Sequence, residues 1–186
     1  MTIKILKRYF KYCKRIILKM YLKIIILLKI KFRRKSASSL YIFDLDNTLA
    51  DTWPSLNLYF SSNSERLKSL KPITGMVKMF DSLILRKKNI YILTARSFEY
   101  FFLTKKWLKK NTEFKNSANL ILVEKPKDKL KFLRLIKQKY EVVYYYDDLS
   151  YNHENKDTKF HHDIINEVKK DVNKYYGYDF ILENFK

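Results

Sequence analysis

The segment LYIFDLDNTL, residues 40–49, is the most informative part of the sequence for the fold. Its first four residues are apolar without polar alternation, which is typical of a strand buried on both faces of a parallel sheet. Asp44 and Asp46 end this run two residues apart, so their side chains can point to the same side. The stretch therefore predicts a strand that delivers two carboxylates to one edge of a sheet.

Three more apolar runs predict further strands at 89–93, 119–123 and 141–146. Helical patterns, in which apolar residues recur every three or four positions, separate these runs and cover 74–87, 97–110, 128–139 and about 158–175. The alternation predicts an α/β fold, with an open, mostly parallel sheet and helices on both faces. The tyrosine run at 144–146 is expected to fill the core of the sheet.

In an open α/β sheet, ligands bind beyond the carboxyl ends of the strands. The polar residues that follow each apolar run are therefore expected to meet at one edge. Besides Asp44 and Asp46, they are Thr94 and Arg96 after the second run, a lysine among Lys125, Lys127 and Lys129 after the third, and Asp147 and Asp148 after the fourth.

The carboxylates at this edge would repel one another unless a cation lies among them. Carboxylate oxygens without histidine or cysteine favour Mg²⁺. A magnesium ion suits an anionic phosphate substrate, because one carboxylate can then attack phosphorus while a second carboxyl group protonates the leaving oxygen. A threonine hydroxyl and a lysine ammonium can hold the phosphoryl oxygens. The residues thus predict phosphoryl-transfer chemistry.

Four short motifs, in this order, resemble those of the haloacid dehalogenase (HAD) superfamily of phosphatases. FDLDNTL at 43–49 is similar to the first motif, ILTAR at 92–96 to the second, a lysine near 129 to the third, and YDD at 146–148 to the fourth. The resemblance implies a HAD-like Rossmannoid fold. It also implies a magnesium-dependent phosphomonoester hydrolase that forms an aspartyl-phosphate.

The resemblance implies roles for the matched residues. Asp44 would be the nucleophile and a magnesium ligand. Asp46 would be the general acid/base, with its backbone carbonyl on the metal. Thr94 would bind the phosphoryl group, and Lys129 would neutralise the nucleophile and the phosphate.

Two assignments stay open at this point. The fourth motif has adjacent aspartates, Asp147 and Asp148, and both are candidate metal ligands. The third-motif lysine is Lys125, Lys127 or Lys129, and we choose Lys129 because the apolar stripe of the following helix then begins at the expected offset.

The sequence departs from many HAD relatives at two places. Asn47 stands where many have glycine, and asparagine tolerates the left-handed backbone that a turn there requires. Residues 52–73 are too few for a folded cap, so we expect a capless enzyme with an open site for a large substrate. TAR at 94–96 is also similar to the 3′-phosphatase part of polynucleotide kinases, where Arg96 would contact the substrate. A nucleic-acid end phosphatase is therefore one alternative, and a catalytically silent binding module is another.

The net charge of +20 is uneven, because 13 of the 39 basic residues precede the first acidic residue, Asp44, and the remaining chain carries +7. On a helical wheel of this leader, basic residues face one side and apolar residues the other. Such a helix suits an anionic membrane surface. We expect a leader over residues 1–39, with Ser36–Ser39 as linker, and a phosphatase domain over residues 40–186. The membrane contact would lie within residues 1–35.

The basic leader is also compatible with functions other than binding to a membrane surface. A signal anchor, a transit peptide and contact with nucleic acid stay open, although Lys19 and Lys23 interrupt the apolar stretch 16–28, which is short for a span. The expected location is cytoplasmic, at the inner face of a membrane. A single cysteine excludes a disulfide framework, and two glycines exclude glycine-rich phosphate loops. The three histidines are expected on solvated surface.

Overall fold

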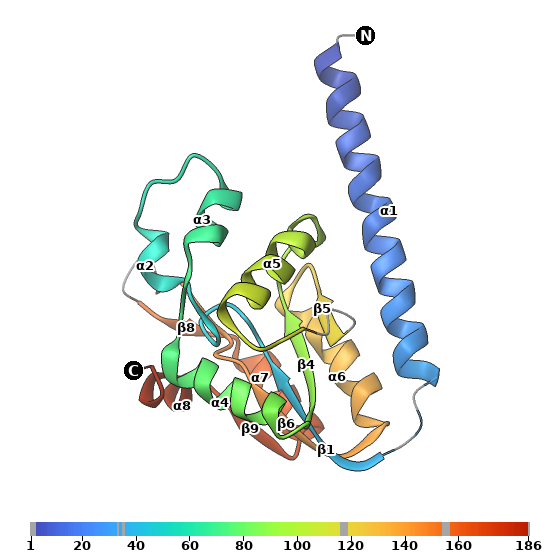
Figure 1. Cartoon of the computed structure of the whole chain (residues 1–186), viewed down its shortest axis with the longest axis vertical. Coiled ribbons are helices and arrows are strands. Elements are labelled where there is room, and N and C mark those ends of the chain that lie inside the picture. Colours follow the sequence, from blue (N-terminus) through green and yellow to red (C-terminus); the bar gives the residue numbers. More distant parts are fainter. Residues whose placement is uncertain (1–2, 33, 35, 116–118, 154–156, 186) are drawn as a thin grey trace.

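The computed structural model describes residues 3–32, 34, 36–115, 119–153 and 157–185. They form an α/β body with one long helix, α1 (Ile3–Phe32), along its side. The N-terminal half of α1 extends beyond the body (Figure 1).

A five-stranded sheet lies at the centre, in the order β5-β4-β1-β6-β9, and each neighbouring pair runs parallel. The strands are β1 (Ser36–Phe43), β4 (Asn89–Thr94), β5 (Leu120–Leu122), β6 (Tyr140–Tyr146) and β9 (Lys174–Tyr176). The predicted α/β class and its parallel sheet are confirmed.

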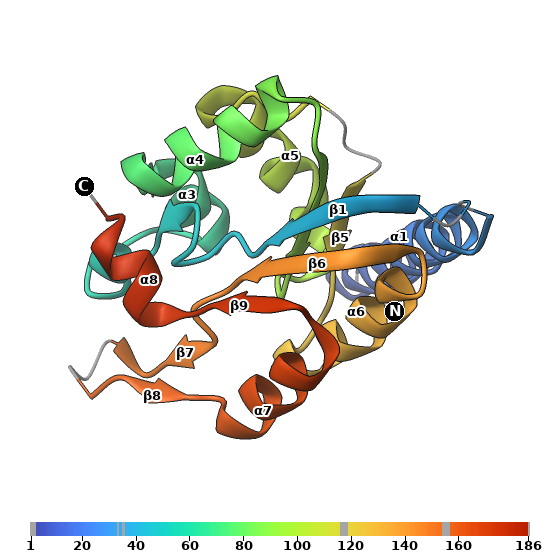
Figure 2. The ribbon, with the colours of Figure 1, turned by 90° about the horizontal axis from the view of Figure 1, so that it is seen from below.

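Helices cover both faces of this sheet (Figure 2). One face carries α4 (Thr74–Leu85), α5 (Phe101–Asn111), which follows the 3₁₀ turn η1 (Phe98–Tyr100), and α8 (Tyr178–Glu183). The other face carries α1, α7 (His162–Asp171) and α6 (Lys129–Lys137), which follows the 3₁₀ turn η3 (Pro126–Asp128). Helices α4, α5, α6 and α7 bury the apolar stripes that their sequence periods predict.

The side chains on the two faces of β1 belong to two separate apolar clusters, because successive strand residues point to opposite sides of the sheet. Leu40 and Ile42 join the cluster under α1, α6 and α7, whereas Phe43 joins the cluster under α4 and α5. The Phe43 ring stacks on Tyr146 at 4.3 Å, and Tyr146 stacks on Tyr176 at 4.4 Å. Each such pair adds about 0.5–1.5 kcal/mol beyond burial. The aromatic row therefore holds β1, β6 and β9 in register.

Two predicted boundaries are wrong. Ser36–Ser39 are not a linker but the first half of β1, where Ser36 pairs with Tyr140 and Ser39 with Val142 of β6. Backbone pairing does not depend on side-chain polarity, so a neighbouring strand extends β1 into polar sequence. The last predicted helix ends at Asp171, and β9 follows it. The apolar period continues to Val172, which is already extended and therefore misled the prediction.

Two small additions follow β1 and β6. After β1, β2 (Ala50–Asp51) pairs antiparallel with β3 (Lys71–Pro72), and α2 (Trp53–Leu56) and α3 (Asn63–Ser69) lie between them. After β6, β7 (Ser150–Tyr151) pairs antiparallel with β8 (Lys159–Phe160). Both additions begin within a few residues of the carboxyl ends of their strands, so they border any site at that edge.

The C-terminal part of α1 packs on the body. Ile26 and Ile30 are only 6% and 3% exposed, within the apolar cluster of α6 and α7. Lys19 forms an ion pair with Glu124, at 3.8 Å. In the part of the chain that the structure describes, no helix combines the length and apolarity needed to cross a bilayer.

Candidate active site

The topology of the sheet reverses between β1 and β6. The chain runs outward from β1 through β4 to β5 on one side, and from β6 to β9 on the other. Such a switch point opens a crevice at the carboxyl ends of the two strands. Phe43 of β1 is paired with Tyr146 of β6, and the Asp44 amide donates to the Tyr146 carbonyl at 2.8 Å. The residues that follow, Asp44 and Asp147, are therefore neighbours.

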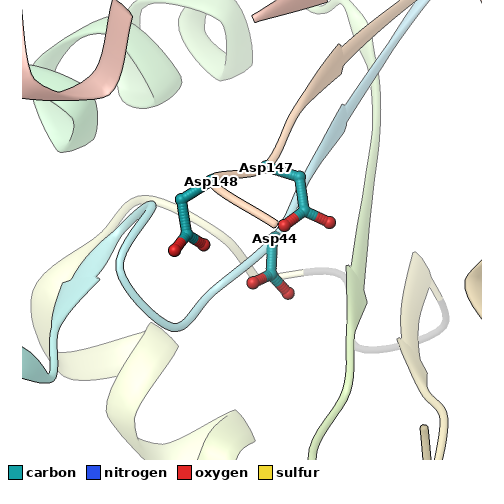
Figure 3. A group of neighbouring side chains, drawn as sticks. All are labelled: Asp44, Asp147 and Asp148. Atoms are coloured by element: carbon teal, nitrogen blue, oxygen red, sulfur yellow. The ribbon is translucent and has the colours of Figure 1, made fainter. Parts of the chain in front are cut away.

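Three carboxylates gather at this point (Figure 3). Asp44, Asp147 and Asp148 are all buried, and each offers an oxygen within 4.8 Å of the oxygens of the other two. Residues more than 100 positions apart in the chain thus form one acidic cluster. The predicted convergence of Asp44 with Asp147 and Asp148 is present in the structure.

Lys129 is the cation of this cluster. Its Nζ lies 2.6 Å from Asp147 Oδ2 and 3.1 Å from Asp44 Oδ1, and its side chain is 3% exposed. It is the first residue of α6, so the helix start directs it at the sheet edge. Lys125 and Lys127 are exposed. Of the three candidate lysines, Lys129 is the one that the fold brings to the carboxylates.

The cluster is electrostatically unbalanced, since three carboxylates face one ammonium. Burial raises the pKa of Asp44 to about 7, with a further contribution from the charge of Asp147, although Lys129 opposes the rise. Burial and the charges of Asp147 and Asp44 also raise the pKa of Asp148 well above its ordinary value. Burial alone would lower the pKa of Lys129, but the two carboxylates outweigh it and raise that pKa. The site therefore favours an added proton or an added cation.

The donor set fits a hard divalent cation. Asp44 Oδ1 lies near Lys129 but accepts no hydrogen bond of ordinary geometry from the described residues. The buried Thr94 hydroxyl, at the end of β4, also has no hydrogen-bond partner among them. A cavity of about 130 Å³ is lined by both residues together with Asp147 and Asp148. Oxygen-only ligands of this kind suit Mg²⁺.

Asp147 and Asp148 are held by different donors. Asp147 accepts from the Tyr145 hydroxyl and from the Leu149 amide, the latter at 3.1 Å, in addition to Lys129. Asp148 accepts from the Ser150 hydroxyl. Asp147 is thus largely occupied by protein donors, whereas Asp148 retains more free acceptor capacity.

Asp46 lies apart from the acidic cluster. Its carboxylate is bound by Arg96 through two parallel contacts, Nε to Oδ2 at 2.7 Å and Nη2 to Oδ1 at 2.5 Å. Arg96 is 4% exposed and also lies 3.4 Å from the Thr104 hydroxyl. Asp46 and Thr94 line the small cavity, but Arg96 is not among its lining residues. The guanidinium predicted to contact substrate is turned toward Asp46.

The loop after β1 is closed by Asn47, which adopts a φ of 56°. The prediction that asparagine supports a left-handed turn here is confirmed. The Asn47 side chain accepts from the Thr52 amide at 3.2 Å and from the Thr52 hydroxyl. The Leu45 carbonyl accepts from the Leu49 and Ala50 amides at 2.9 and 2.8 Å. These bonds close the loop that carries Asp46, which lines the cavity.

Sequence reasoning missed the residues that β7 and β8 bring to this edge. His153 was expected on solvated surface, but its Nε2 lies 2.8 Å from the Ser150 hydroxyl and its side chain is 10% exposed. His161 lines the small cavity and stacks on Tyr151 at 4.6 Å. His162 is exposed. No apolar run or motif marked this hairpin, so its sequence carried no signal.

A second, larger cavity of about 580 Å³ adjoins the first. His161 lines both cavities, and Lys127, Tyr151 and Phe160 contribute to the larger one. A volume of this size is in the range of sites for small organic ligands. The cavity at the acidic edge therefore shares the His161 wall with a partly aromatic recess.

No family model matches the sequence, and no curated protein matches it. Among solved structures, the chain is similar to the class C acid phosphatase from Bacillus anthracis, with a TM-score of 0.53 and 16% identity. The match covers 91% of this chain and 82% of that one. The similarity shows that the two chains share a fold.

Proposed function

We propose that this protein is a magnesium-dependent phosphomonoester hydrolase that works through an aspartyl-phosphate on Asp44. One observation carries the proposal: Asp44 lies with Asp147, Asp148 and Lys129 at the switch point of a HAD-like sheet. Burial of this cluster keeps water from competing with the phosphate for these groups. A role confined to folding would not require four charged side chains to be buried together, because an apolar cluster is usually at least as stable.

Asp44 acts as the nucleophile in the first step. One of its oxygens bonds to phosphorus as the bond from phosphorus to the ester oxygen breaks. Lys129 orients Asp44 and offsets the charge of the phosphoryl group. The Thr94 hydroxyl, which has no protein partner among the described residues, donates to a phosphoryl oxygen. Bound between Asp44, Asp147 and Asp148, Mg²⁺ would supply positive charge to the phosphoryl oxygens.

Asp46 moves the protons. In the first step Asp46, which must carry a proton when the substrate binds, gives that proton to the departing ester oxygen, which leaves as an alcohol. In the second step it takes a proton from a water molecule that attacks phosphorus, releasing inorganic phosphate and restoring the Asp44 carboxylate. The two-point contact with Arg96 fixes the direction of the Asp46 carboxyl group. Arg96 is therefore a positioning residue for Asp46, in place of the substrate contact expected from sequence.

The organic part of the substrate occupies the larger cavity. It lies within reach of the phosphate site because His161 borders both spaces. The stacked rings of Tyr151 and His161 offer a flat surface to an aromatic or similarly planar group. Lys127 adds a positive charge at the same wall. An aryl phosphate is therefore a suitable first substrate.

The test is hydrolysis of an aryl phosphate by the full chain with Mg²⁺, and its arrest by EDTA. Asp44→Asn should abolish turnover while circular dichroism stays unchanged, because the amide is nearly isosteric but cannot attack phosphorus. Asp81→Asn on α4 is the matched control and should retain activity. If neither aryl phosphates nor 3′-phosphorylated oligonucleotides are hydrolysed, the protein is a silent binding module and the proposal is wrong.

A further inference from the structure

Helix α1 presents an apolar row that the body does not cover. Its members are three, four or seven residues apart, which places them on one side of the helix, and their exposed fractions lie between 52% and 73%: Leu6, Phe10, Ile17, Met20 and Ile24. An uncovered stripe of large apolar side chains along a helix of 30 residues marks an interaction surface. We call these five residues the outer row.

The outer row faces away from the body. Successive helix residues turn by about 100° around the axis, so Ile26 and Ile30 lie roughly opposite Ile17 and Ile24. Ile26 and Ile30 are buried against the body. At the C-terminal end of α1, the Lys31 carbonyl accepts a hydrogen bond from the Lys139 ammonium of the body at 2.9 Å. The C-terminal part of α1 is thus docked in an orientation that leaves the outer row pointing outward.

The positive charge of α1 indicates which kind of partner could cover the outer row. Ile3–Phe32 contains ten basic residues and no acidic one, and three more basic residues follow at 33–35. A second copy of α1 would cover the outer row, but it would add ten more positive charges to the pair of helices and no acidic residue to offset them. Nucleic acid would neutralise the charge and leave the outer row in water. An anionic lipid surface satisfies both features, because it accepts apolar side chains below a layer of negative headgroups.

We propose that α1 binds in the plane of an anionic membrane surface, with the outer row inserted among the lipid chains and the basic side chains at the headgroups. Each basic residue close to such a surface strengthens binding by about fivefold. Apolar insertion adds to this attraction. This proposal does not depend on the enzymatic one, since no residue of the outer row lines either cavity of the active site.

The test uses the full chain with vesicles of phosphatidylcholine alone, or with phosphatidylserine added. We expect sedimentation with the anionic vesicles and at least tenfold weaker binding to the neutral ones. Cys13 is the single cysteine of the chain and lies between Phe10 and Ile17 of the outer row. A polarity-sensitive dye on Cys13 should shift to the blue when anionic vesicles are added, which reports insertion rather than adhesion.

Ile17→Gln combined with Met20→Gln should reduce binding at least tenfold and remove the dye shift. The control is Leu85→Gln combined with Phe102→Gln, which removes two equally exposed apolar residues from α4 and α5 and should bind as the native chain does. Equal binding to neutral and anionic vesicles would overturn the proposal, as would full binding by the outer-row variant. Self-association through α1, or salt-sensitive binding of oligonucleotides without vesicle binding, would also overturn it.

Discussion

Removing the charge of Asp44 should stabilise the metal-free protein, and the effect should depend on pH. The pKa of Asp44 is raised from 3.8 to about 7, chiefly by burial. Each tenfold change in proton affinity is worth about 1.4 kcal/mol, so the ionised folded state is destabilised by about 4 kcal/mol at pH 8. Because of its raised pKa, Asp44 holds a proton more tightly in the folded state than in the unfolded state. The destabilisation is therefore absent below pH 4, and the folded protein loses this part of its free energy of unfolding as pH rises through 7.

Asp44→Asn removes the ionisation and should therefore raise the free energy of unfolding in EDTA by up to about 4 kcal/mol at pH 8. At pH 4 the native and variant proteins should differ by little. Added Mg²⁺ should stabilise the native protein at pH 8 more than the variant, since binding to the folded state alone raises its stability.

The assay is urea unfolding followed by the fluorescence of Trp53 and Trp107, at both pH values, with EDTA or Mg²⁺. Asp157→Asn, at a carboxylate whose side chain is 65% exposed, serves as the control and should change stability little at either pH. Lower stability of Asp44→Asn at pH 8 in EDTA would refute the reasoning, because it would mean that the ion pair with Lys129 outweighs the cost of burying the Asp44 carboxylate.

Three further predictions concern the neighbours of this residue. Lys129→Met should abolish activity and lower the free energy of unfolding by about 3–5 kcal/mol, because it leaves buried carboxylates without their cation; unchanged urea unfolding would contradict this. Arg96→Lys keeps the charge but loses the two-point contact with Asp46, so kcat should fall at least tenfold with little change in KM. A rise in KM at constant kcat would instead make Arg96 a substrate contact. Tyr151→Ala should raise KM for an aryl phosphate about fivefold, because one ring contact of about 1 kcal/mol is lost, and should leave KM for glycerol phosphate nearly unchanged; parallel changes for both substrates would argue against the aromatic recess.

Much of the sheet edge that carries Asp44 and Asp147 was predictable from local sequence. Apolar runs without alternation mark strands buried on both faces, and β1, β4, β5 and β6 all lie where such runs occur. The acidic residues that end β1 and β6 could then be placed at one edge, because the ends of parallel strands coincide. The left-handed turn at residue 47 was likewise predictable, because asparagine tolerates this backbone conformation.

Other features had no local signal. β9 has only three residues and is partly buried, so its place in the sheet depends on Tyr176 stacking beside Tyr146. Ser36–Ser39 are small and polar, and only their pairing with β6 makes them a strand. The hairpin of β7 and β8 is short, yet it carries Tyr151 and His161 to the cavities.

Local sequence specifies four of the five strands of the central sheet and the carboxylates that follow β1 and β6, because burial periodicity and strand polarity act over a few residues. It also determined that α1 is amphipathic and strongly basic. Tertiary packing alone pairs Arg96 with Asp46 and leaves the outer row of α1 uncovered, and it brings Lys129, the lysine chosen from the helical stripe, to Asp44 and Asp147. These outcomes depend on how helices pack across the sheet, which joins residues too distant in the chain for any local pattern to relate them.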